Sequence, residues 1–109
     1  MNPYGERAKA YWQTYRPTAL AAIPETDRDA LFTRIGEAVE TEIGETYMDL
    51  VPDPEPGEEV ETSERAGQIG MAKLMAREAA MDQFVYLEKE PGTETKDMPA
   101  TTPLPKITA

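Results

Sequence analysis

The sequence predicts an all-α fold: a small three-helix domain followed by an extended, proline-rich C-terminal tail. Apolar residues recur at spacings of three and four in three separate segments, which is the periodicity of a helix with a buried face. Each segment also begins at a capping residue or ends near proline. The predicted helices span residues 3–15, 27–49 and 63–87. They belong to a domain of residues 1–88, and residues 89–109 form the tail.

The first predicted helix has a defined start and stop. Asn2 can cap it, and Pro3 suits the first helical position. Pro17 ends it, because a residue before proline avoids helical dihedrals. One stripe of this helix is mostly aromatic: Tyr4, Ala8, Tyr11, Trp12 and Tyr15. We interpret it as a packing face, in the core or at an interface, rather than a surface that stacks nucleobases.

A short apolar connector, residues 17–24, leads into the second helix, and its Leu20 and Ile23 are expected to contact the core. Thr26 is the predicted start of the second helix, with acids in the first turn. Its apolar stripe consists of Leu31, Phe32, Ile35, Val39, Ile43 and Tyr47. Gly36 lies beside this stripe, where it would permit a close helix crossing.

An acidic linker, residues 51–61, separates the second and third helices. Pro52, Pro54 and Pro56 alternate along it and favour an extended path. Its acids do not have the spacing of a calcium-binding loop, so we interpret it as a solvated linker.

The third predicted helix carries two apolar stripes, about 140° apart at 100° per residue. One consists of Ile69, Ala72, Ala76, Ala80 and Leu87, and the other of Met71, Leu74, Met81 and Val85. The first two helices can cover one stripe. The second stripe is either wrapped by the same chain or covered by a partner. Its residues Leu74, Met81 and Val85 are therefore candidate partner-binding residues.

The predicted tail cannot be helical, because it contains Pro91, Pro99, Pro103 and Pro105. Its sizeable apolar side chains are Met98, Leu104 and Ile107. Two interpretations stay open: an arm that docks on a partner with Leu104 and Ile107 in pockets, or a mobile, solubilising tail.

The composition argues against an enzyme. The chain has no cysteine and no histidine, and Ser63 is its only serine. Thiolate metal sites, disulfides and histidine-dependent catalysis are thereby excluded. We expect no cofactor and no metal. No apolar run approaches the roughly 20 residues that span a bilayer, and the N-terminus lacks a signal-peptide pattern.

The formal net charge of −10 is concentrated in the middle of the chain. Residues 25–64 contain fourteen acids and two bases, a net charge of −12. Such a segment disfavours direct contact with nucleic acid or anionic membrane, since both are polyanions. It suits a basic partner surface, or it serves only to keep the protein soluble.

Four motifs carry a family resemblance: Tyr-Trp-x-x-Tyr-Arg-Pro from Tyr11, Phe-Thr-x-Ile-Gly-Glu from Phe32, the segment GQIGMAKLMAREA from Gly67, and VYLEKEP from Val85. With these the chain resembles small acidic proteins encoded by actinobacterial phages and integrated mobile elements, over residues 4–91. The resemblance implies a product of a virion-assembly region and supplies no catalytic residues.

The expected function is that of a non-enzymatic interaction protein, a virion or assembly component. It would dock or self-associate through helix 63–87 and reach a phage structural protein with its tail. We expect it in the host cytoplasm during assembly, with the virion as a second location. The alternative is an acidic inhibitor that covers the nucleic-acid-binding surface of a host protein.

Overall fold

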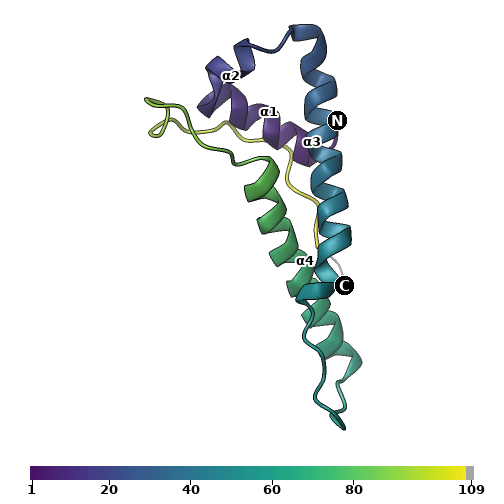
Figure 1. Ribbon diagram of the computed structural model, residues 1–109. Helices are drawn as coiled ribbons and strands as arrows, with labels where there is room; N and C mark the ends of the chain where they lie inside the picture. Colours follow the sequence, from purple (N-terminus) through teal and green to yellow (C-terminus); the bar gives the residue numbers. More distant parts are fainter. Residues whose placement is uncertain (108–109) are drawn as a thin grey trace.

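A computed structural model describes residues 1–107, and these contain helices and no strand. The elements are α1 (Pro3–Tyr15), α2 (Pro17–Ala21), α3 (Glu25–Thr46), the 3-10 helix η1 (Tyr47–Leu50) and α4 (Thr62–Phe84). The all-α prediction is confirmed, and the three longer helices lie within a few residues of their predicted bounds (Figure 1).

One helix was not expected. The segment predicted as an apolar connector contains α2, which starts at Pro17. No neighbouring side chain caps this helix. Instead, the backbone N–H groups of Thr18 and Ala19 each donate to a carboxylate oxygen of Glu90, at 2.9 Å. A distant residue therefore accepts the N-terminal hydrogen bonds of a short helix that starts with proline at its first position.

The first helix follows its local sequence signals. Asn2 Oδ1 accepts from the backbone N–H of Gly5 at 2.8 Å, and Pro3 occupies the first turn. Helix α3, by contrast, starts at Glu25 after Pro24 and has no side-chain cap, so Thr26 is not its N-cap.

The core forms where α1, α3 and the C-terminal half of α4 meet. The predicted aromatic packing face is confirmed, because three tyrosines of α1 are buried there and Trp12 packs against Phe32 edge-on, at 5.7 Å between ring centroids. The buried cluster consists of Tyr4, Ala8, Tyr11, Tyr15, Phe32, Val39, Ala80, Met81 and Val85.

The molecule is elongated, with extents of 57 × 28 × 21 Å and a radius of gyration of 17.2 Å. A compact domain of this length has a radius of gyration of about 13 Å. Figure 1 shows the cause: α1 crosses only the upper part of α3, while the rest of α3 pairs with α4 below it. We call this extension, residues 37–75, the arm.

The acidic linker closes the tip of the arm. It turns at Gly57, whose φ of 84° suits glycine, and Glu58 N–H donates to the carbonyl oxygen of Glu55. Val51 is buried at the start of the linker, and Lys73 Nζ lies 5.2 Å from the ring centroid of Tyr47. These contacts hold η1 against α4.

The segment after α4 runs back along α1 without regular structure as far as residue 107 (Figure 1). Tyr15 holds it at three points. Its carbonyl oxygen accepts from Glu90 N–H at 2.9 Å and from Thr93 Oγ1 at 3.2 Å, and its hydroxyl donates to the carbonyl oxygen of Lys96 at 2.7 Å. Met98 and Leu104 pack against the core. Thr108 and Ala109, the last residues of the predicted tail, lie outside the described residues.

Candidate interaction surface

Three of the predicted partner-binding residues, Leu74, Met81 and Leu104, line one groove beside α4, whereas Val85 lies in the core and does not line it. Met81 and Val85 are buried in the protein's own core, with exposures of 3% and 0%. Val85 offers no surface to a partner and Met81 only a small part of its side chain, at the groove wall, so partner contact by these two residues stays a prediction. Leu74, Leu104 and Ile107 are partly exposed. Leu104 packs against the core of its own chain.

The second apolar stripe of α4 is covered over only half its length. Around its C-terminal half, Tyr11 donates from its hydroxyl to the carbonyl oxygen of Leu87, and its ring lies tilted against that of Tyr86, at 5.4 Å between ring centroids. Towards the N-terminus, α4 runs beyond α1. Met71, with 58% exposure, therefore stays uncovered, as does the adjacent Met75, with 47% exposure.

The two methionines line a groove between α4 and the chain that follows α3. The groove has a volume of about 410 Å³ and is mostly apolar. Its lining residues are Leu50, Pro52, Glu64, Gly67, Gln68, Met71, Ala72 and Met75. We call it the methionine groove. Sequence periodicity placed Met71 on an apolar stripe but could not show that no helix would cover it.

The exposed side of α4 has acids at both ends and methionines between them. At 100° per residue, five exposed residues fall within a stripe about 60° wide. We call it the exposed stripe, and in chain order it consists of Glu64, Met71, Met75, Glu78 and Asp82. Methionine side chains adapt their shape to an apolar partner, and the flanking carboxylates add charge selectivity.

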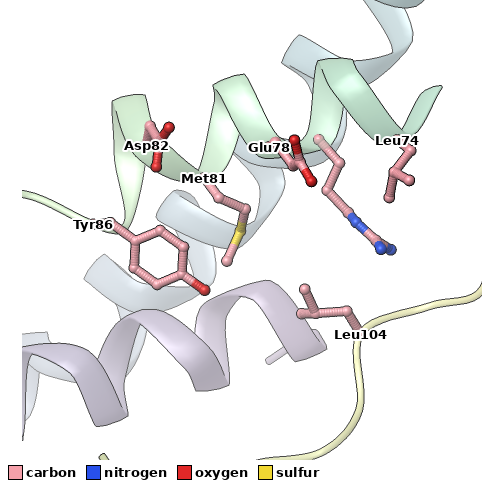
Figure 2. A pocket seen from close by; sticks show the side chains of 7 residues that line it. Leu74, Glu78, Met81, Asp82, Tyr86 and Leu104 are labelled. Carbon is pink, nitrogen blue, oxygen red and sulfur yellow. The ribbon is translucent and has the colours of Figure 1, made fainter. Parts of the chain in front are cut away.

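A second groove, of about 350 Å³, continues along the C-terminal half of α4. Figure 2 shows Leu104 facing α4 across this groove, where the tail forms the opposite wall. Arg77, which also lines it, donates from Nη1 to the carbonyl oxygen of Pro105 at 2.6 Å. The chain's own tail thus forms one wall of this groove, whereas the methionine groove is bounded by α4 and the segment around Leu50.

The arm has a strongly negative surface. Its residues, 37–75, include eleven acids and two bases, Arg65 and Lys73, a net charge of −9. In the part of the chain that the structure describes, no three acidic side chains gather where they could hold a metal ion. The acids instead spread along the arm and surround the methionine groove with negative potential.

Within residues 1–107, none of the helices combines the length and the apolar character needed to cross a membrane.

Comparisons with protein-family models, with curated protein sequences and with solved structures gave no match. The geometry of the arm is therefore the basis for a functional proposal.

Proposed function

We propose that this protein is a non-enzymatic interaction protein, an assembly component of a phage-type particle, and that it docks on a protein partner through the methionine groove. The observation that carries the proposal is the pair of exposed methionines, Met71 and Met75, on an arm that projects from the core.

The energetics support docking at this position. Burying one methionine side chain gains about 1.5–3 kcal/mol. Leu50, with 40% exposure, borders the same groove and would add to this gain. Because the groove is already formed by packed segments, binding orders few further residues. More of the free energy gained by burial therefore remains as affinity.

The tail has a different role in this proposal from the one expected from sequence. Instead of extending into solvent, the tail packs on its own chain: it is hydrogen-bonded to Tyr15 of α1, and its Leu104 contacts the core. Partner contact thereby moves to the N-terminal half of α4, where neither α1 nor the tail covers the helix.

The alternative, an acidic inhibitor of a nucleic-acid-binding protein, is favoured by the charge of residues 35–64. The two functions differ in what they require. An inhibitor depends mainly on its acids, whereas an assembly component that docks through the groove depends on its methionines.

Incorporation into particles tests the proposal. Cells that produce the particles would express the tagged chain, and purified particles would be probed for it. We expect the Met71→Asp/Met75→Asp variant to be lost from particles, because two charges in the groove prevent apolar contact. Met48→Asp is the matched control, since Met48 lies on the same arm with 52% exposure and does not line the groove. Equal incorporation of all three proteins contradicts the proposal.

If instead the chain is absent from particles and blocks nucleic-acid binding by a host protein, the inhibitor hypothesis is correct.

A further inference from the structure

We infer that the partner of the methionine groove is a basic amphipathic helix, with apolar side chains at its centre and lysine or arginine at both ends of the same face. This inference rests on the proposed docking through the groove and adds the chemistry of the occupant. It follows from the length, the charge order and the self-pairing geometry of the exposed stripe.

The length of the stripe fits a helix. Glu64 and Asp82 are eighteen residues apart on α4. They are therefore separated by about 27 Å along the helix axis, or five turns. The groove beside Met71 is lined by one helix and by the segment around Leu50, and this arrangement takes an apolar helix face lengthwise.

The charge order of the stripe selects the occupant. Its two methionines lie between Glu64 on one side and Glu78 and Asp82 on the other. A partner helix with an apolar centre meets the methionines, and basic residues at its ends meet the acids. Because the acids lie at the rim, they contribute mainly to association rate and selectivity, while burial of the methionines provides affinity.

A second copy of this chain does not fit the same surface. Antiparallel pairing of two α4 helices about Met71 and Met75 would place Glu64 of one copy opposite Asp82 of the other. Parallel pairing would place each acid opposite itself. Either register brings like charges together, in addition to the repulsion between two chains of net charge −10 each.

A nucleic acid does not fit either. The arm has eleven acids against two bases, Arg65 and Lys73, a net charge of −9, so as a whole it repels a phosphate backbone. A basic protein helix satisfies both the apolar centre and the acidic ends.

A synthetic probe tests the inference directly. It is a helical peptide of about 20 residues with leucines at the centre and lysines at both ends of one face. Its binding to the full chain would be followed by fluorescence anisotropy at several salt concentrations. The opposite face of the probe carries serines. Two control peptides keep the composition: one moves the lysines to the opposite face, and the other exchanges the central leucines with those serines.

Two groups of variants distinguish binding at the methionine groove from nonspecific electrostatic attraction to the acidic chain. We expect Met71→Gln/Met75→Gln to weaken binding by about tenfold or more, whereas Met48→Gln leaves it unchanged. The triple variant Glu64→Gln/Glu78→Gln/Asp82→Asn should weaken binding and reduce its salt dependence. A matched triple variant, Asp53→Asn/Glu58→Gln/Glu59→Gln, removes the same charge from the linker and should have a much smaller effect.

Three results would overturn the inference. The first is no preference for the probe over its control peptides. The second is an equal loss of affinity in the two triple variants, which would mean that only the general acidic field matters. The third is a dimer of the unmodified chain in analytical ultracentrifugation that Met71→Gln/Met75→Gln dissociates, which would make a second copy the occupant. In the third case docking through the groove would still stand, because particle incorporation tests it separately.

Discussion

Gly5 of α1 and Gly36 of α3 face each other where the two helices cross. A β-carbon on Gly36 would lie 2.9 Å from the backbone nitrogen of Gly5 and would collide with the side chain of Asn2. A β-carbon on Gly5 would lie 2.6 Å from the carbonyl oxygen of Phe32. Backbone atoms cannot move aside as side chains can, so this crossing requires glycine on both helices. The close crossing predicted at Gly36 is confirmed.

Substituting the two glycines of α3 should have opposite effects. Gly36→Ala places a methyl group against backbone and should lower the free energy of unfolding by about 1–3 kcal/mol. Gly44→Ala meets nothing within 4 Å and should raise that free energy by up to about 1 kcal/mol, because alanine favours a helix. Urea unfolding followed by circular dichroism measures both changes. A stabilising Gly36→Ala would show that the crossing is looser than described.

Two methionines of α4 should respond differently to truncation. Met81 is 3% exposed, so Met81→Ala should lower the free energy of unfolding by about 2–5 kcal/mol, through lost burial and a new cavity. Met71 is 58% exposed, and Met71→Ala should change it by less than about 0.5 kcal/mol. Thermal unfolding of the two variants compares them directly. Equal losses would mean that Met71 is also part of the core.

The contact between Glu90 and α2 should depend on pH. The N–H groups of Ala19 and Thr18 donate to the Glu90 carboxylate, and they lower its pKa below the ordinary value of 4.5. A lowered folded-state pKa stabilises the protein above the unfolded-state value, and this contribution disappears as the pH falls through the folded-state value. The wild type should therefore lose stability below about pH 4.5 more steeply than Glu90→Gln.

Urea midpoints at a series of pH values measure this difference. Glu88→Gln serves as the control, because its carboxylate is exposed and makes no such contacts. The same pH profile for wild type and Glu90→Gln would exclude a role for this cap in stability.

Removing the tail should destabilise the domain. Truncation after Gly92 deletes Thr93, which is 5% exposed, and the core contacts of Met98 and Leu104. We expect the free energy of unfolding to fall by about 1–3 kcal/mol, since the lost burial is partly offset by the released chain entropy. Urea unfolding measures the change, and the helix signal in native buffer should persist. An unchanged midpoint would mean that the tail contacts add nothing to stability.

Local chemistry was sufficient to predict most helices. The first helix begins at Pro3 after an Asn2 cap, as predicted, because both signals act within one turn. The helical periodicity of α3 and α4 also predicted that these helices exist, and it gave their bounds to within a few residues. The short helix α2 was missed, although Pro17 at its first position is a local start signal. Only its cap lies outside the local sequence, because the N-terminal hydrogen bonds go to Glu90, about seventy residues along the chain.

The sequence by itself determined that this protein is helical, acidic and without histidine or cysteine chemistry, because composition and periodicity are properties of the chain alone. Only the tertiary structure decided which half of the second α4 stripe is covered. Helix α1 has 13 residues and α4 has 23, so α1 is too short to cover the whole length of the α4 stripe. Met81 is consequently buried and Met71 exposed, although both lie on the same predicted stripe. The path of the tail was likewise decided by its contacts with Tyr15, which join residues about eighty positions apart.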